Sequence, residues 1–328
     1  MIGDRPREAW PAVCPVYGQQ ILRDQFDVSP CLAVFYFTRQ RDDSFFVLVF
    51  SQLSVLTWGG VALFGWRVWL SNAEAFTGVF DLLARFAPSA GKDGRWDLRL
   101  PAVGLLDKRP LPISGVCFVL LLLTTVTFDG ILETPLWAGL LEWISESQAL
   151  RPSLIPIQNS GVDLIALIKT VTLVVLPCVF IVVYMAFCHA IAAFGGGRVS
   201  IRDVAGYFVL SLVPIAIAYH LSHYLSYLLI AGQNIIPLIS DPFGFGWDLF
   251  GTGAYRLDIG IVNAKLIWFV AVTTVVIGHV LAVYVAHVMA VRVFAERRAA
   301  LKSQAPMLVL MVGYTMISLW VLSQPIVS

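Results

Sequence analysis

The sequence predicts an all-α fold, a polytopic membrane bundle of about six transmembrane helices. Hydrophobic residues make up 58% of the 328 residues, charged residues only 13%, and the mean hydropathy is +0.80. In soluble globular domains the apolar share is about 45–50%. Long apolar runs recur along the chain, and each supplies the roughly 20 residues that cross a bilayer. The protein is therefore expected in a lipid bilayer, and its net charge of +1 gives no attraction to nucleic acid.

Six apolar runs form the predicted transmembrane domain, residues 46–328, which follows an N-terminal extension, residues 1–45. Spans are expected at about 46–70, 111–132, 163–194, 204–232, 262–292 and 306–325. The third to fifth exceed about 25 residues, so they are expected to tilt or to extend beyond the bilayer. Four prolines mark predicted helix edges (Pro112, Pro135, Pro237 and Pro306), and two inside spans predict kinks (Pro177 and Pro214).

Basic residues gather in alternate loops, which predicts the orientation. The loops after the first, third and fifth spans carry most of the Lys and Arg, whereas the loops between them carry mostly Asp and Glu. Cytoplasmic loops are enriched in Lys and Arg, so these three loops are placed on the cytoplasmic side. The C terminus is then expected outside.

Residues 1–45 would also lie outside, although they contain several arginines. They have neither the apolar core of a signal peptide nor an amphipathic period. Two interpretations remain open. The segment is an outside extension whose acids offset its arginines, or it is a stub that normally follows another membrane segment. The second interpretation implies a partner chain, that is, a second membrane subunit, or a lost upstream half.

The five histidines all fall in the third to fifth predicted spans: His189, His220, His223, His279 and His287. An ionisable ring in hydrocarbon is costly, so such residues are functional candidates by default. At 1.5 Å per residue, His220, His223 and His279 are expected near the midplane, and the other two nearer the cytoplasm. His220 and His223 share a helical face, and His279 and His287 can point to one side, so an inward-facing cluster is expected.

Imidazole is a common ligand for transition metals, so these histidines predict a site for a divalent transition metal with an open coordination position. Two histidines on different helices could equally clamp a haem iron. The alternative is that each histidine only hydrogen-bonds a neighbouring helix, as polar residues in membranes commonly do.

Other polar groups gather toward the outer face and are candidate substrate-binding residues: Asp129, Gln233, Asp241 and Asp248. Asp129 could instead pair with Lys169. The loop IIPLISDPFGFGWDLFGTG is either an interfacial segment anchored by Trp247 and the phenylalanines or a lid over a cavity that leads to the histidines. Three tyrosines near the histidines are interpreted as packing residues: Tyr219, Tyr224 and Tyr227.

Four runs resemble a family of bacterial polytopic membrane proteins commonly labelled fenitrothion hydrolase, after a membrane-bound organophosphate-degrading enzyme with two kinds of subunit. They are ALFGWRVWLSNAEAFTGVFDLLARFAP, LLLTTVTFDGILETPLWAGL, AYHLSHYLSYLLIAGQNIIPLISDPFGFGWDLFG and APMLVLMVGYTMISLWVLSQ. The resemblance covers about residues 55–325. It implies the bacterial inner membrane, a lipophilic small-molecule substrate and a second membrane subunit. Relatives are typically longer at the N terminus.

The resemblance and the histidines together predict a metal-dependent phosphotriester hydrolase or a subunit of one. His220, His223 and His279 would hold a metal that lowers the pKa of bound water and acts as a Lewis acid. His189 and His287 would hold a second metal or relay protons, and the outer loop would admit substrate. The alternative is a transporter or membrane redox subunit that binds a transition metal or haem through the same histidines. A purely structural membrane subunit is a third possibility.

Overall fold

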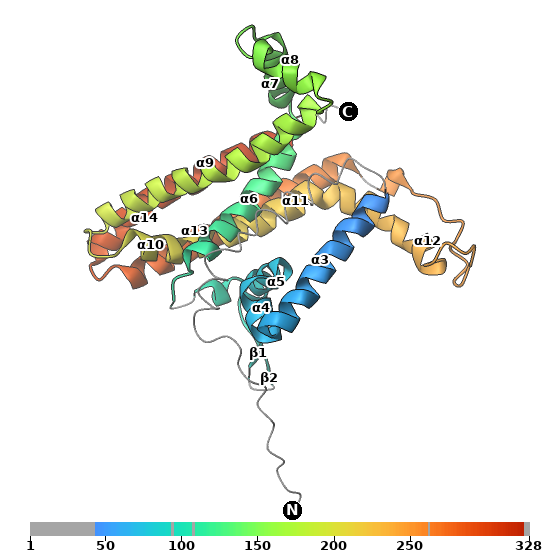
Figure 1. Ribbon diagram of the computed structural model, residues 1–328. Helices are drawn as coiled ribbons and strands as arrows, with labels where there is room; N and C mark the ends of the chain where they lie inside the picture. Colours follow the sequence, from blue (N-terminus) through green and yellow to red (C-terminus); the bar gives the residue numbers. More distant parts are fainter. Residues whose placement is uncertain (1–42, 93–94, 107–108, 262, 325–328) are drawn as a thin grey trace, which may run out of the picture. The chain divides into compact units, whose positions relative to one another are not determined.

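The computed structural model describes residues 43–92, 95–106, 109–261 and 263–324 (Figure 1). The predicted N-terminal extension, residues 1–45, therefore lies almost wholly outside the described residues. The contacts divide the chain into two units, residues 1–84 and 85–328, and each is considered by itself.

The all-α fold class is confirmed. Within the described ranges, helices predominate and the sheet is one two-stranded hairpin. Five helical segments there are long and apolar enough to cross a membrane: Ile113–Leu132, Leu164–Phe194, Ile201–Ser240, Ala264–Val293 and Arg297–Ser323. They correspond to the second to sixth predicted spans.

The first predicted span, 46–70, is not one helix. Helix α3 (Asp43–Phe64) ends before Gly65, and α4 (Trp66–Asn72) follows. Gly65 has a φ of +81°, a conformation that glycine adopts at little cost. Trp69 is buried against Phe64, with ring centroids 5.9 Å apart, and a Cβ at Gly60 would lie 2.1 Å from the Trp69 ring. Two glycines thus let the chain fold back, and the apolar helix is shorter than expected.

Helix α5 (Ala75–Phe86) leads into the second unit, which begins with small elements that the sequence did not predict. Strands β1 (Ser89–Lys92) and β2 (Arg95–Leu98) pair antiparallel, with Ala90 opposite Asp97. A short 3-10 helix, η1 (Val103–Leu105), follows. The Arg99 side chain donates to the Ala87 carbonyl at 3.1 Å, which ties the hairpin to the end of α5.

Helices α6 (Ile113–Leu132) and α9 (Leu164–Phe194) match the predicted second and third spans closely. Pro112 immediately precedes α6, as expected of a helix-edge proline. Two shorter helices separate the spans, α7 (Pro135–Glu146) and α8 (Arg151–Asn159). Asp163 caps α9 because its carboxylate accepts from the backbone N–H groups of Ile165 and Ala166.

The fourth predicted span, 204–232, is a chain of helical pieces rather than one α-helix. It consists of α10 (Ile201–Phe208), the 3-10 segment η2 (Val209–Leu212), α11 (Val213–Ala231), η3 (Gly232–Asn234) and α12 (Ile235–Ser240). The 3-10 segment ends two residues before Pro214, which has no N–H to continue an α-helical ladder. The helix thus changes type just before Pro214, and the kink expected there stays a prediction.

The last two spans are α13 (Ala264–Val293) and α14 (Arg297–Ser323), preceded by the 3-10 turn η4 (Ile259–Ile261). Helix α14 begins nine residues before Pro306, so the prediction that Pro306 marks its start is wrong. Pro237 likewise lies inside α12. The polar stretch Arg297–Gln304 extends α14 beyond the apolar run that the sequence pattern detected.

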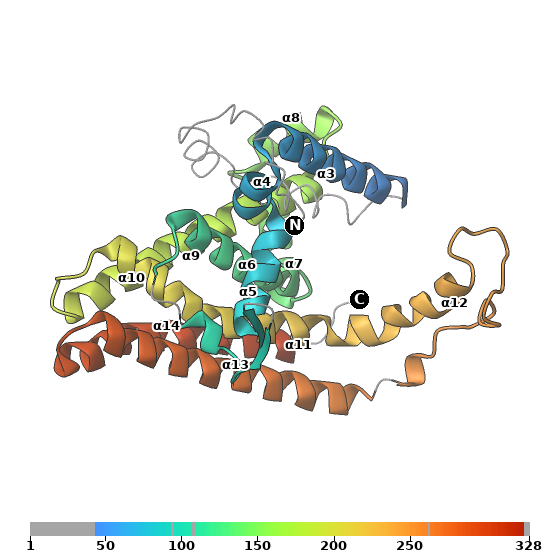
Figure 2. The ribbon, with the colours of Figure 1, turned by 90° about the horizontal axis from the view of Figure 1, so that it is seen from below.

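The segment from α10 to α11 forms the centre of the second unit. Most residues from Val204 to Tyr219 are buried, whereas α9 exposes a row of large apolar side chains such as Val175 and Val182. Helix α11 packs along α13, and α14 packs along α13 and α9 (Figure 1 and Figure 2). At Gly278 of α13 an added Cβ would lie 2.4 Å from the Ala218 Cβ and 2.8 Å from the Pro214 carbonyl oxygen, so α11 and α13 approach closely there.

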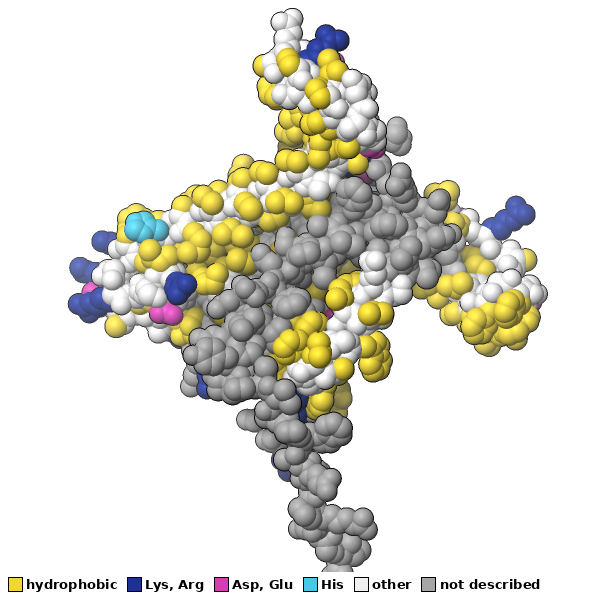
Figure 3. All heavy atoms as spheres, in the orientation of Figure 1, with side chains coloured by type: hydrophobic (Ala, Val, Ile, Leu, Met, Phe, Trp, Pro, Cys, Tyr) yellow, Lys and Arg dark blue, Asp and Glu magenta, His cyan; other side chains and the backbone are white. Residues whose placement is uncertain are grey.

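Three close approaches place the basic loops of this unit at one end. Arg292 donates to the Leu106 carbonyl at 2.9 Å, and the Leu111 N–H donates to the Gly206 carbonyl at 3.1 Å. A Cβ at Gly195 would meet the Phe294 ring at 2.1 Å. Figure 3 shows Lys and Arg side chains at the end of the bundle where α9 ends and α14 begins, while hydrophobic side chains cover the helices beyond.

Candidate functional site

An acid–imidazole pair joins two of the apolar helices. Asp129, near the end of α6, is buried, and its Oδ2 lies 3.3 Å from the Nε2 of His223 on α11. The neighbouring Tyr224 donates its hydroxyl to the same Oδ2 at 2.9 Å. A carboxylate inside a membrane helix is tolerated when donors satisfy it, and α11 supplies two donors here.

Lys169 is not the partner of Asp129: in the described part of the chain no ion pair joins these two residues. The sequence-based alternative of an Asp129–Lys169 pair is therefore replaced by Asp129–His223–Tyr224. We call these three residues the acid–imidazole site.

Tyr219 lies one turn before His223 and borders the acid–imidazole site. Its ring centroid is 6.1 Å from that of His223, and its side chain is fully buried. Among the described residues its hydroxyl has no hydrogen-bond partner, which is rare for a buried polar group. The ideal Cβ position at Gly130 is 3.1 Å from this hydroxyl, 3.6 Å from the Cε1 of His223 and 2.6 Å from the Cγ1 of Val321. Glycine at 130 therefore allows α6, α11 and α14 to converge.

Tyr314 of α14 closes the other side of Tyr219. The two rings meet edge to face with centroids 6.1 Å apart. Unlike Tyr219, Tyr314 has hydroxyl partners, Thr127 Oγ1 at 2.9 Å and the Leu123 carbonyl at 3.3 Å, both on α6. Tyr314 therefore links α14 to α6 by hydrogen bonds next to Tyr219.

The remaining histidines make separate contacts. The Nδ1 of His220 donates to the Ala216 carbonyl of its own helix at 2.8 Å, and the Nδ1 of His279 lies 3.0 Å from Thr315 Oγ1 on α14. His287 pairs through its Nδ1 with Gln304 Oε1 at 2.9 Å.

His189 and His287 are exposed on the surface of their helices. The prediction of an inward-facing cluster is therefore wrong for these two residues, because their side chains on α9 and α13 are exposed. His220, His223 and His279 are partly buried, but each has a different partner.

Metal ligation by the histidines stays a prediction. Over the described ranges, no group of three or more His, Cys, Asp or Glu side chains lies together in a way that could hold a metal ion. As the side chains lie, they do not fit the predicted set of His220, His223 and His279 as ligands of one metal.

Among the outer polar residues, Gln233 holds the loop before α13 through hydrogen bonds. The Gln233 amide oxygen accepts from the Tyr255 hydroxyl and the Asp258 N–H, both at 2.9 Å, while its nitrogen donates to the Leu229 and Asp258 carbonyls. Gln233 thus ties the segment before α13 to the end of α11. With both polar atoms engaged, it is a structural anchor in this conformation.

The two loop carboxylates order turns after α12. Asp241 accepts from the N–H groups of Phe245 and Gly246 at 2.9 and 2.8 Å. Asp248 accepts from the Gly253 N–H and the Ser240 hydroxyl, both at 2.8 Å. The hydrogen bond from Gly253 is the main reason that the pKa of Asp248 is lowered below its ordinary value.

The same loop carries exposed aromatic side chains. Phe243, Phe245 and Trp247 contact one another, with ring centroids between 5.3 and 6.0 Å apart. Helix α12 and this loop extend away from the other helices of their unit (Figure 2). Exposed, mutually packed aromatic rings fit the interpretation of an interfacial segment. A role for the loop as a lid stays a prediction.

Sequence reasoning missed Gly130, Thr127 and Tyr314 and interpreted Tyr219 only as packing. Apolar helical runs contain many such residues, and their importance appears only when α14 is placed against α6. The one usable signal was Asp129, an acid inside an apolar run, which predicts a polar neighbour on another helix.

The comparisons with known proteins add no relative. No family model matches the chain, and no match was found among the curated proteins or the solved structures.

Proposed function

We propose that this chain is a membrane-embedded hydrolase of lipophilic phosphotriesters, or a subunit of one, with His223 as its general base. The observation that carries the proposal is the contact of His223 with Asp129, 3.3 Å apart on two different apolar helices. A carboxylate that accepts from one imidazole nitrogen orients the ring and stabilises the imidazolium that forms when the other nitrogen takes a proton.

The proposed reaction uses only residues of the acid–imidazole site. The Nδ1 of His223 takes a proton from a water molecule while the water oxygen forms a bond to phosphorus. The bond from phosphorus to the aryl oxygen breaks, and the departing phenolate receives the proton from His223. Water is the only co-reactant, and no group is oxidised or reduced. Tyr224 keeps the Asp129 carboxylate oriented through its hydrogen bond of 2.9 Å.

Two considerations support this substrate class. The four sequence runs that resemble the fenitrothion hydrolase family include Asp129 and His223 themselves. In addition, α11 exposes the side chain of Tyr227, one turn after the partly exposed His223, so a lipophilic ester can approach from hydrocarbon.

The same proposal covers the setting of the enzyme. The membrane is the bacterial inner membrane, the basic end faces the cytoplasm, and the C terminus lies outside. A second membrane subunit accompanies the chain. No step above uses a metal, because among the described residues no three His, Cys, Asp or Glu side chains lie together as ligands of one ion.

A second candidate is a proton-coupled transporter or membrane redox subunit. The buried position of the Asp129–His223 pair within apolar helices favours it, because intramembrane carboxylate and imidazole groups commonly form proton relays. In that function the pair would pass a proton between the two sides and would hydrolyse nothing.

The test is nitrophenol release from a nitrophenyl phosphotriester by the purified protein in detergent, compared among wild type, His223→Asn, Asp129→Asn and His189→Asn. Loss of a general base lowers the rate about 10²–10⁴-fold, so the first two variants are expected to fall by that order. His189→Asn is expected to stay within roughly twofold of wild type, because His189 is exposed and remote from the site.

Equal losses from His223→Asn and His189→Asn, restored by added metal, would instead favour the histidine-bound metal. Absence of hydrolysis together with proton uptake into proteoliposomes that Asp129→Asn abolishes would support the second candidate.

A further inference from the structure

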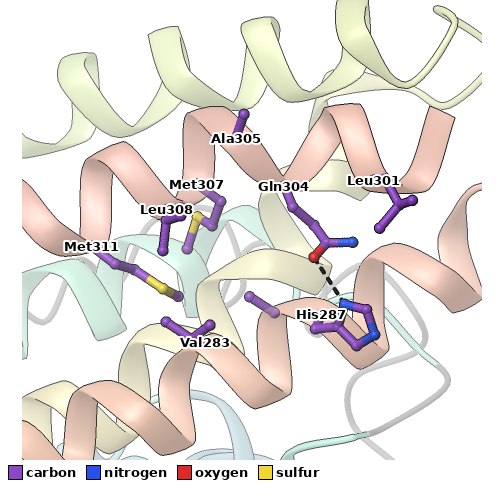
Figure 4. Close-up of a pocket in the computed structure, with 9 residues that line it drawn as sticks. Val283, His287, Leu301, Gln304, Ala305, Met307, Leu308 and Met311 are labelled. Carbon is purple, nitrogen blue, oxygen red and sulfur yellow. Dashed lines mark hydrogen bonds between the residues drawn. The ribbon is translucent and has the colours of Figure 1, made fainter. Parts of the chain in front are cut away.

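A cleft runs between α13 and α14 on the surface of the second unit (Figure 4). Its volume is about 290 Å³. Its lining is apolar except for one polar pair, and it comprises Val283, Ala286, His287, Leu301, Gln304, Ala305, Met307, Leu308 and Met311. Leu301, Ala305 and Leu308 are exposed, so the cleft opens on the outer surface of two membrane-spanning helices.

The polar pair in the cleft is fixed in orientation. The Gln304 Nε2 donates to the Ala300 carbonyl at 2.9 Å, which turns its Oε1 toward His287. The His287 Nδ1 lies 2.9 Å from that oxygen and donates to it (Figure 4). The other ring nitrogen of His287 is then left for a partner outside the pair.

A basic residue stands above the cleft on the same helix face. Arg297 precedes Leu301 by four residues and Gln304 by seven, and these intervals return to one side of an α-helix. Arg297 is exposed, and its guanidinium makes no ion pair or hydrogen bond with another described residue. Seven residues correspond to about 10 Å along the axis, so Arg297 lies about two turns toward the basic end.

The surroundings of Arg297 are also basic. Between the end of α13 and the first turns of α14 stand four cations and one acid: Arg292, Glu296, Arg297, Arg298 and Lys302. An occupant of the cleft must therefore have an anionic head about two helical turns from the polar pair and an apolar tail along the Met and Leu side chains.

We propose that this cleft seats an anionic phospholipid. Its phosphate binds the Arg297 guanidinium, its glycerol region lies beside His287 and Gln304, and one acyl chain follows Val283, Met307 and Met311. The arrangement matches a bilayer, because the headgroup layer on each side of the hydrocarbon core is only about 5–7 Å thick and an arginine side chain reaches across it. Basic clefts between membrane helices bind such headgroups. The inference is independent of the proposed hydrolase.

The experiment measures lipid binding to the full chain purified in detergent, by native mass spectrometry and by thermal unfolding with added phosphatidylglycerol or phosphatidylcholine. Wild type is expected to bind phosphatidylglycerol in preference. Arg297→Gln is expected to weaken that binding roughly fivefold, since one basic residue near an anionic headgroup contributes about 1 kcal/mol. Inorganic phosphate, which has no acyl chain, is expected to give no shift.

Two further variants complete the test. Arg256→Gln removes an exposed cation remote in sequence, in the loop before α13, and is expected to leave the preference intact. Ala305→Phe fills the cleft from an exposed position and is expected to abolish tight binding of phosphatidylglycerol without disturbing the core. Equal binding of both lipids by wild type, an unchanged preference in Arg297→Gln, or an equal loss in Arg256→Gln would overturn the proposal.

Discussion

The rings of Tyr219 and Tyr314 meet edge to face with centroids 6.1 Å apart, yet within the described part of the chain only the Tyr314 hydroxyl has a hydrogen-bond partner. Both side chains are buried between α6, α11 and α14. The same chemical change, removal of one oxygen, is therefore expected to have opposite consequences at the two positions.

Tyr314→Phe is expected to lower the free energy of unfolding by about 1 kcal/mol, because Thr127 and the Leu123 carbonyl lose a hydrogen-bond partner. Tyr219→Phe is expected to be neutral or stabilising, because it removes a buried hydroxyl that no described residue hydrogen-bonds. Thermal unfolding in detergent measures both. A loss at Tyr219→Phe as large as that at Tyr314→Phe would show that the Tyr219 hydroxyl has a partner in the folded protein.

Gly278 and Gly313 form a second matched pair, since both are glycines inside long helices. Gly278→Val is expected to destabilise strongly, by about 1–3 kcal/mol or more, because its side chain would meet Ala218 and the Pro214 carbonyl. Gly313→Ala is expected to stabilise by roughly 0.5–1 kcal/mol, because nothing lies within 4 Å of the added Cβ. The comparison fails if both substitutions shift the unfolding temperature in the same direction.

Cysteine labelling tests the orientation that the charge distribution predicts. In a background without native cysteines, Arg198→Cys and Arg298→Cys are expected to resist an impermeant reagent added to intact cells. Glu146→Cys, in the loop region between α6 and α9, is expected to react. Labelling of Arg198→Cys and Arg298→Cys without labelling of Glu146→Cys would reverse the orientation.

Asp248 links the order of the aromatic loop to its ionised state. Because the pKa of Asp248 is lowered in the folded protein, the stabilisation of the loop by its ionised carboxylate is complete above the pKa of the unfolded chain. That stabilisation is lost as the pH falls through the folded pKa. Between about pH 5 and 8 the loop is therefore expected to keep constant protease resistance. Asp248→Asn is expected to increase cleavage near Phe250, with Glu142→Gln as a control outside the loop. Strong variation of wild-type cleavage over that pH range would contradict the assignment.

Much of the fold could be predicted from the sequence, because the apolar runs alone define where a chain can cross hydrocarbon. Helix α9 begins and ends within one residue of the predicted 163–194, and α13 within two residues of 262–292. The break at Gly65 was missed because an apolar run does not reveal a residue of positive φ. The early start of α14 was missed because Pro306 was interpreted as a helix edge.

The candidate site was predictable only as separate residues. Asp129 and His223 each stood out as polar groups in apolar runs, but 94 residues separate them in the sequence. Periodicity relates residues within one helix and carries no information on which helices become neighbours. For the same reason His220 and His223, three residues apart, were assigned to one metal although their rings have different partners.

The contact of Gly130 with Val321 gives the final turns of α14 an influence on Asp129. A Cβ added at Gly130 would lie only 2.6 Å from the Cγ1 of Val321, so α6 and α14 are in close contact at this point. Val321 lies two residues before the end of α14. A purification tag or fusion partner that displaces this end of α14 would therefore disturb the packing around Asp129. Functional assays are best made with the affinity tag placed elsewhere.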